Sequence, residues 1–136
     1  MIKTKELMLG NWVLAGAKTQ FQMYVVGVFK DVAYIDFKGN MGDFFEVKEE
    51  DMFPVPLTEK FFIKNGFLKK KDKISEYYTS PDGKVFIRFR KGISIYIVSA
   101  PVSSSVKRVS ANKLIKYVHE LQNLLTLAGV EMEFKI

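Results

Sequence analysis

The sequence predicts an α+β fold that is mostly antiparallel. In order, we expect an N-terminal SH3-like small β-barrel, a short helix, a small antiparallel sheet and a long packed C-terminal helix. Three observations lead to this prediction. Valine- and aromatic-rich runs alternate with turn residues in the first half, a doubly capped helix follows, and an apolar helical stripe lies near the end. With 136 residues and 48% hydrophobic side chains, the chain can bury a core without disulfides or metals.

Short strands dominate the expected first half. Such strands at close spacing are typical of a small barrel or a curled meander, so we predict an SH3-like barrel over 7–57. Pro54 and Pro56 end this half because proline cannot continue a central strand. We therefore divide the chain into an SH3-like β-barrel subdomain, 1–57, and an α+β subdomain, 58–136, packed as one unit. The expected strands of the first half are 12–14, 21–29, 32–37 and 44–47.

The next element is a helix of about two turns, 59–65, whose ends are both specified locally. Thr58 occupies the N-cap position. Gly66 occupies the position after the C-cap, where a left-handed backbone is common, and Phe67 can then touch Phe62.

Three strands are expected after this helix, at 74–79, 84–90 and 93–98, with a turn at 80–83. The register of the last two strands follows from burial. A three-residue turn pairs Phe89 with Ile93 and buries the apolar residues together. The same register places Phe86 opposite Tyr96 on the other face.

The last large element is predicted to be a helix over 111–128. Ser110 is a suitable N-cap and Gly129 a suitable stop. The tail at 130–136 alternates apolar and charged residues, which predicts a final strand. Four residues at helical spacing form the apolar stripe of the helix: Leu114, Val118, Leu121 and Leu125.

The charge distribution points to a polyanionic partner. The net charge is +6, yet residues 67–116 alone carry twelve basic and three acidic residues. Such asymmetry favours nucleic acid, although it also fits a solvated basic surface. Aromatic and basic residues on one sheet face can stack bases and neutralise phosphates. The candidate nucleic-acid-binding residues are Lys69, Lys70, Lys71, Lys84, Phe86, Arg88, Tyr96, Lys107 and Arg108.

Little in the composition favours catalysis or a cofactor. The chain has no cysteine and a single histidine, His119, which we interpret together with Gln122 as structural. Asp36, Glu46 and Lys48 match a short metal-nuclease pattern, but the helices of that fold are not predicted here. No apolar run approaches the ~20 residues of a membrane span, and the first residues lack the core of a signal peptide. We expect a cytoplasmic protein with no membrane association and no cofactor.

Three segments together resemble a known group of proteins. They read Glu-Leu-Met-Leu-Gly-Asn-Trp-Val at 6–13, Pro-Val-Pro-Leu-Thr-Glu at 54–59 with Lys-Asn-Gly-Phe at 64–67, and Lys-Tyr-Val-His-Glu-Leu-Gln-Asn-Leu-Leu at 116–125. This order is similar to small uncharacterised proteins of gut-associated anaerobic bacteria, often encoded by prophages and other mobile elements. The resemblance implies a mobile-element setting. It implies no catalytic residue, because the group has no established activity.

Two functions are therefore expected. The first is a small non-enzymatic accessory or interaction protein of a mobile element, with an unknown protein partner. The twelve phenylalanines also allow an apolar surface that a homodimer would bury. The alternative is a nucleic-acid-binding module that uses the basic region 67–116.

Overall fold

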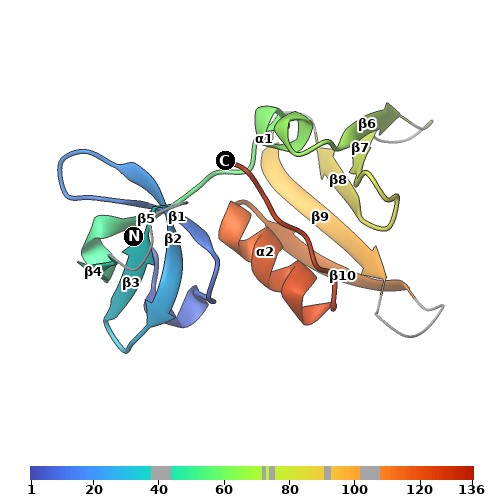
Figure 1. The fold of residues 1–136 in the computed structure, drawn as a ribbon. Coiled ribbons are helices and arrows are strands. Elements are labelled where there is room, and N and C mark those ends of the chain that lie inside the picture. The colour runs from blue at the N-terminus through green and yellow to red at the C-terminus, as the bar shows by residue number, and fades with distance from the viewer. Residues whose placement is uncertain (38–43, 72, 74–75, 91–92, 102–107) are drawn as a thin grey trace. The chain divides into compact units, whose positions relative to one another are not determined.

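The computed structural model of the chain describes residues 1–37, 44–71, 73, 76–90, 93–101 and 108–136 (Figure 1). For residues 90, 93–101 and 108–113 it describes the backbone. The chain forms two compact units. The first unit comprises Met1–Pro56 and Tyr117–Asn123, and the second comprises Leu57–Lys116 and Leu124–Ile136. None of the helices in the described ranges has the length and apolar composition needed to cross a membrane.

The first unit is built on a five-stranded antiparallel sheet of order β4-β3-β2-β1-β5. Short 3-10 helices lie at Thr4–Glu6 and Glu49–Asp51. The strands are β1 (Trp12–Ala15), β2 (Phe21–Val28), β3 (Val32–Asp36), β4 (Phe45–Lys48) and β5 (Met52–Pro54).

One face of this sheet carries the core of the first unit. Val13 and Ala15 of β1, Met23 and Val25 of β2, and Ala33 and Ile35 of β3 are buried two residues apart on their strands, so each pair shares the buried face. Ile2 and Leu7 of the N-terminal segment belong to the same buried cluster. The Ile2 N–H donates to the Met52 carbonyl oxygen at 3.0 Å, which ties that segment to β5.

The predicted SH3-like barrel is wrong, because the sheet is not closed. Among the described residues, no strand pairing joins the edge strands β4 and β5. β5 has only three residues and ends at Pro54, which has no N–H to extend a ladder. The predicted α+β fold class is also wrong: the chain is mostly β, with two antiparallel sheets and, in its described ranges, one helix longer than six residues.

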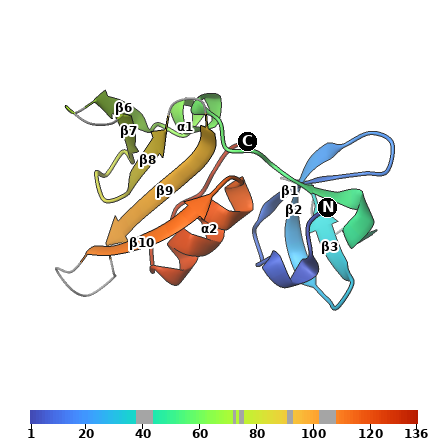
Figure 2. The ribbon, with the colours of Figure 1, turned by 180° about the vertical axis from the view of Figure 1, so that it is seen from behind.

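The second unit contains the other five-stranded antiparallel sheet, of order β10-β9-β8-β7-β6, which can be followed in Figure 2. Strand β6 at the edge was not predicted, although the lysines in it were singled out. The elements are α1 (Glu59–Lys64), β6 (Leu68–Lys71), β7 (Glu76–Thr79), β8 (Phe86–Arg90), β9 (Ile93–Pro101) and β10 (Arg108–Ile115).

Helix α1 confirms the prediction made from its caps. The Thr58 hydroxyl accepts a hydrogen bond from the Phe61 N–H at 3.2 Å. Gly66 has φ +78°, and the Phe67 N–H donates to the Phe62 carbonyl at 3.0 Å, as in a Schellman motif. The rings of Phe62 and Phe67 lie 5.5 Å apart. The helix ends at Lys64, one residue earlier than expected.

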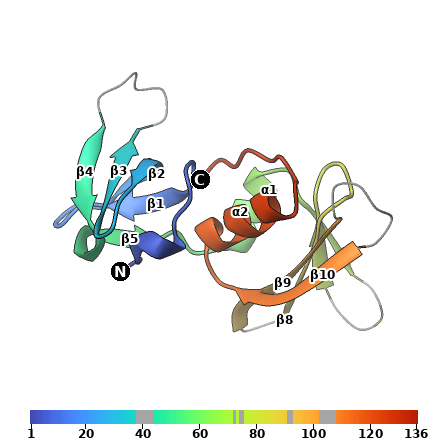
Figure 3. The same cartoon turned by 90° about the horizontal axis from the view of Figure 1, so that it is seen from below.

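Aromatic side chains fill the core of the second unit. Phe62 of α1 stacks on Tyr78 of β7 at 4.5 Å, and Tyr78 stacks on Phe89 of β8 at 5.0 Å. Phe134 of the C-terminal tail contacts the ring of Phe61 at 5.4 Å. Figure 3 shows α1 and the end of the last helix on one side of this sheet. We call the Tyr78 side of the sheet its inner face.

The predicted helix over 111–128 is wrong in its first half. Residues 108–115 form β10, paired with β9, and the helix α2 is Val118–Leu127. Leu114 is 61% exposed whereas Ile115 is fully buried, which is the period of a strand. Residues 108–110 and 114–115 pair with β9, with a register shift between Ser110 and Leu114, so the helical spacing of the apolar residues does not decide the structure here. The predicted stop is confirmed, since Gly129 has φ +73°.

The C-terminal tail is not the predicted strand. Residues 130–136 have no regular secondary structure. The side chain of Asn65 holds the tail instead: its Nδ2 donates to the Lys135 carbonyl at 2.8 Å, and its Oδ1 accepts from the Lys135 N–H at 2.7 Å. The tail is thus held by hydrogen bonds to one amide side chain and not by pairing with a strand.

The register of β8 and β9 also differs from the prediction. Phe89 pairs with Tyr96, and Phe86 pairs with Ser99. An irregularity between Phe89 and Arg90 shifts the register, so the assumed regular hairpin does not form. The expected turn residues 91–92 lie outside the described residues.

Candidate functional site

One side of the second sheet brings basic and aromatic residues together. Lys70, Tyr77 and Arg88 are register partners in one row across β6, β7 and β8. Tyr78 and Ile87, their neighbours along the strands, are buried on the inner face, so this row lies on the opposite side. We call this side the outer face and define it by Leu68, Lys70, Tyr77, Phe86 and Arg88, with Lys84 in the turn that precedes β8.

The outer face is open to solvent along the row of Lys70, Tyr77 and Arg88, whereas Thr79, which pairs with Leu68 and Phe86 in the next row, is buried. Lys70, Lys84 and Arg88 are exposed, and Tyr77 is half-buried. The rings of Tyr77 and Phe86 lie 6.2 Å apart with a tilt of 43°. At the β6 edge of the sheet, Leu68 is 58% exposed. An aromatic pair with cations around it is therefore accessible to a ligand.

The lysine run 69–71 is divided between the two faces. The Nζ of Lys69 lies 2.9 Å from Glu59 Oε1 and 3.9 Å from Glu76 Oε2, and 5.7 Å from the centre of the Phe89 ring. The hydrogen bond to Glu59 raises the pKa of Lys69. Lys71 is the register partner of Glu76. Of the three lysines, Lys70 alone belongs to the outer face.

The predicted interface is thus only partly assembled. Lys70, Lys84, Phe86 and Arg88 gather on the outer face, whereas Lys69 and Lys71 do not. Tyr96 is the register partner of Phe89 and not, as predicted, of Phe86. Arg108 pairs with Pro101 at the far end of β9 and β10. Lys107 lies outside the described residues.

Sequence reasoning missed Tyr77, which takes the place expected for Tyr96. The signal was present in the turn. Ser80 accepts from the Val85 N–H through its hydroxyl at 3.0 Å, and Gly83 has φ +73°. A turn closed by Ser80 and Val85 pairs Tyr77 with Arg88. The alternation of a strand then separates Tyr77 from the buried Tyr78.

The first unit exposes a different kind of surface. Five of its phenylalanines are between 39% and 56% exposed. They form two groups, which we call the Phe37 cluster and the Tyr34 cluster. The Phe37 cluster has edge-to-face contacts of Phe37 with Phe21 and with Phe45, both at 6.1 Å. The Tyr34 cluster has ring contacts of Tyr34 with Phe29 at 5.1 Å and with Phe44 at 5.4 Å.

The two units differ in charge. The residues of the first unit include six lysines and nine acids, which gives −3. Those of the second unit include fifteen basic residues and six acids, which gives +9. A polyanion would therefore be attracted to the second unit and not to the first.

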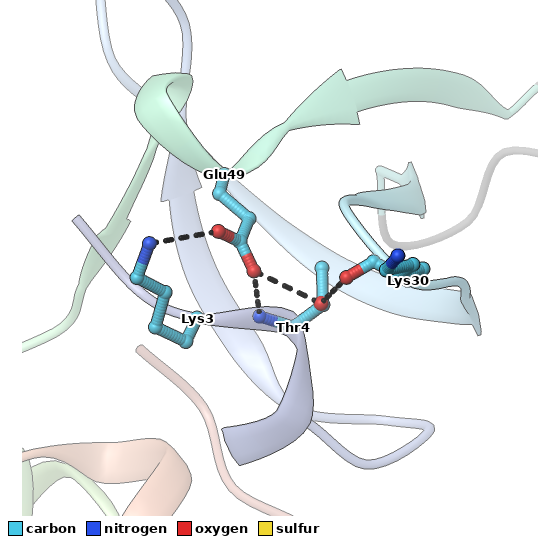
Figure 4. A network of polar contacts seen from close by, with 4 residues as sticks. All are labelled: Lys3, Thr4, Lys30 and Glu49. Carbon is cyan, nitrogen blue, oxygen red and sulfur yellow. Dashed lines mark hydrogen bonds and ion pairs between the residues drawn. The ribbon is translucent and has the colours of Figure 1, made fainter.

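A polar network in the first unit has a structural role (Figure 4). Glu49 accepts at Oε1 from the Thr4 N–H at 2.8 Å and the Thr4 hydroxyl at 3.0 Å, and at Oε2 from Lys3 Nζ at 3.0 Å. The Thr4 hydroxyl oxygen also lies 2.6 Å from the Lys30 carbonyl oxygen, so its single proton is shared between that carbonyl and Glu49. The hydrogen bond from the Thr4 backbone, followed by that from Lys3, lowers the pKa of Glu49.

The polar side chains of α2 are also used within the fold. Gln122 accepts from the Trp12 N–H at 2.9 Å and donates to the Gly10 carbonyl at 3.0 Å. Asn123 donates to the Glu6 carbonyl at 2.7 Å. The buried ring of His119 stacks on Tyr117 at 6.0 Å. These side chains position the segment 6–12 and the helix.

The metal-nuclease pattern is not assembled into a metal centre. Glu46 accepts from the Tyr34 hydroxyl at 3.3 Å, and the Asp36 carboxylate accepts from the Phe37 N–H at 2.7 Å. Lys48 is the register partner of Val32, at the other end of β3. In the ranges that the structure describes, no three acidic, histidine or cysteine residues are grouped as metal ligands.

Comparison of the chain with protein-family models, with curated proteins and with solved structures gives no significant match.

Proposed function

We propose that this chain is a small non-enzymatic interaction protein that binds a protein partner through its first unit. The observation that carries the proposal is the exposure of five phenylalanines in the Phe37 and Tyr34 clusters. Aromatic side chains are enriched at protein interfaces, and contiguous exposed apolar groups mark such surfaces. The resemblance of segments 6–13, 54–67 and 116–125 to mobile-element proteins suggests that the partner acts in the life cycle of such an element.

A site-specific crosslink tests this proposal. A photoreactive benzoylphenylalanine replaces Phe45 in one sample and the exposed Lys60 of the second unit in another. In host cells, the probe at position 45 is expected to crosslink one protein that the probe at position 60 does not reach. Adding Phe21→Ser should abolish that crosslink. Equal labelling from both positions, or none from position 45, would contradict a partner at the Phe37 cluster.

A second candidate function is nucleic-acid binding by the second unit. The specific observation in its favour is the charge of +9 on a unit whose outer face exposes Lys70, Lys84 and Arg88. Phosphate-driven binding weakens steeply with salt, whereas an apolar protein contact need not. Fluorescence anisotropy with labelled DNA and RNA at low and near-physiological salt tests it. Absence of binding at low salt would exclude this function.

A further inference from the structure

We infer that the outer face of the second sheet binds single-stranded nucleic acid, with Tyr77 stacking on a base and its flanking cations contacting phosphates. The inference rests on the second candidate function and specifies its site and ligand. It names a surface that the sequence pattern alone did not assemble, because Tyr77 replaces Tyr96 as the second aromatic residue.

The order of side chains across the sheet fits this ligand. Lys70 and Arg88 stand one strand to either side of Tyr77 in the same row. Neighbouring strands are about 4.8 Å apart, so a cation flanks the ring on both sides at close range. Phe86, 6.2 Å from Tyr77, extends the aromatic surface along β8. A stacked base on such a surface has basic groups next to its own backbone.

Single strands fit better than duplexes for a geometric reason. A base can stack on a side chain only when its face is free, and a duplex buries those faces between neighbouring bases. Duplex recognition in the major groove usually inserts a helix or a two-stranded ribbon. The row Lys70, Tyr77 and Arg88 instead runs across three strands of a five-stranded sheet. The outer face is therefore a surface on which bases can stack, and not a helix or ribbon that enters a groove.

The distribution of charge between the two faces of the sheet also favours the outer face as the binding site. On the inner face, Lys69 is paired with Glu59 and Glu76, so its charge is balanced by carboxylates. On the outer face, Lys70 and Arg88 are exposed, and Lys84 is exposed in the turn that precedes β8. These exposed cations attract a polyanion to the outer face.

The test uses the full chain and fluorescein-labelled 20-nucleotide oligo(dT), with a mixed-sequence duplex of equal length for comparison. Single-strand binding is expected to be the tighter of the two. Tyr77→Ala should weaken it by about tenfold, and Tyr77→Phe by less than about twofold, because the ring carries the stacking. Tyr77→Leu keeps apolar bulk in the sheet and should match Tyr77→Ala. Thermal unfolding of each variant verifies that it is folded.

Arg88→Ala provides the electrostatic readout, with Lys60→Ala as its control. Lys60 is exposed on α1, on the inner side of the same unit, and its loss removes the same charge. Arg88→Ala should reduce the slope of log K against log salt by about 0.7, the value for one phosphate contact on a single strand. Lys60→Ala should leave the slope unchanged.

The two levels of the proposal fail differently. Salt-sensitive binding that Tyr77→Ala and Tyr77→Leu leave intact, or that prefers the duplex, would overturn the stacking site and leave nucleic-acid binding standing. Equal effects of Arg88→Ala and Lys60→Ala would also overturn the outer face as the site. No binding of either nucleic acid at low salt would overturn both.

Discussion

Glu49 shows how one carboxylate can fix a chain terminus. It receives two hydrogen bonds from Thr4 and one from Lys3, which lie 45 and 46 residues away in sequence. Local sequence does not indicate these partners, because nothing near residues 49–51 points to a segment 45 residues away in the chain. Glu49 differs from its neighbours because the folded N-terminal segment lies next to its side chain. This proximity cannot be predicted from the residues around position 49.

The first prediction concerns the pH dependence of this network. The pKa of Glu49 is lowered from its ordinary value of 4.5, so the carboxylate stabilises the fold above that value. This contribution disappears as pH falls below 4.5 and through the lower folded-state pKa. Glu49→Gln should therefore be less stable than the wild type in urea at pH 7. The difference should shrink as pH falls below 4.5 and the Glu49 carboxylate becomes protonated in the folded protein.

Glu50→Gln is the matched control for Glu49→Gln. Glu50 is exposed and is adjacent in the chain. It should show no such pH-dependent loss. A stability difference for Glu49→Gln that is constant from pH 7 to pH 3 would contradict the assignment, because it would not follow the titration of a carboxyl group.

The second prediction concerns Asn65 and the C-terminal tail. Its side chain makes two hydrogen bonds with the Lys135 backbone and one with the Phe61 carbonyl. Asn65→Ala should cost about 1.5–4.5 kcal/mol of unfolding free energy, because it removes three hydrogen bonds at roughly 0.5–1.5 kcal/mol each. Native-state hydrogen exchange should show a faster amide at Lys135. Unchanged exchange there would mean that Phe134 packing alone holds the tail.

At the scale of elements, local signals succeeded where they were complete. Helix α1 was predicted with both caps because Thr58 and Gly66 lie within two residues of the ends of the helix.

The third prediction concerns the N-cap of α1: Thr58→Ala should lower the free energy of unfolding by about 1 kcal/mol. Thr58→Ser retains the oxygen that accepts from Phe61 and should behave nearly as wild type in urea unfolding. Equal losses for Ala and Ser would contradict the capping role.

Helix α2 and strand β10 show where local signals misled. The apolar spacing of Leu114, Val118 and Leu121 is helical, yet Leu114 belongs to a strand. Strand formation at 108–115 depends on pairing with β9. The local pattern of apolar residues in 108–115 does not reveal this pairing. A local sign of the true start does exist. Glu120 accepts from the Tyr117 N–H at 3.2 Å, as the third helical residue of a capping box does.

At the scale of the whole molecule, the sequence predicted the approximate place of seven described strands but missed β5, β6 and β10, and it did not predict the fold class. The first sheet is open because β4 and β5 do not pair with each other in the described residues. The last helix is shorter than predicted because residues 108–115 pair with β9 as a strand. The candidate site was half predicted for the same reason. Phe86 and Arg88 follow from alternation along one strand, whereas the place of Tyr77 and the pairing of Tyr96 with Phe89 follow from register between strands.

The division of charge, −3 on the first unit and +9 on the second, gives a prediction for the whole molecule. A polyanion should bind the second unit alone, while the phenylalanine clusters of the first unit remain available to a protein. Binding of oligo(dT) should therefore leave the crosslink from position 45 unchanged. Competition between the two ligands would contradict separate binding surfaces.

The most direct measurement is an NMR titration of the ¹⁵N-labelled full chain with oligo(dT) at near-physiological salt. We expect amide shifts concentrated in β6, β7 and β8, with the largest near Lys70, Tyr77 and Arg88. Amides of the first unit should not move. Shifts centred on the Phe37 or Tyr34 clusters, or spread evenly over exposed lysines of both units, would contradict the outer face as the nucleic-acid site.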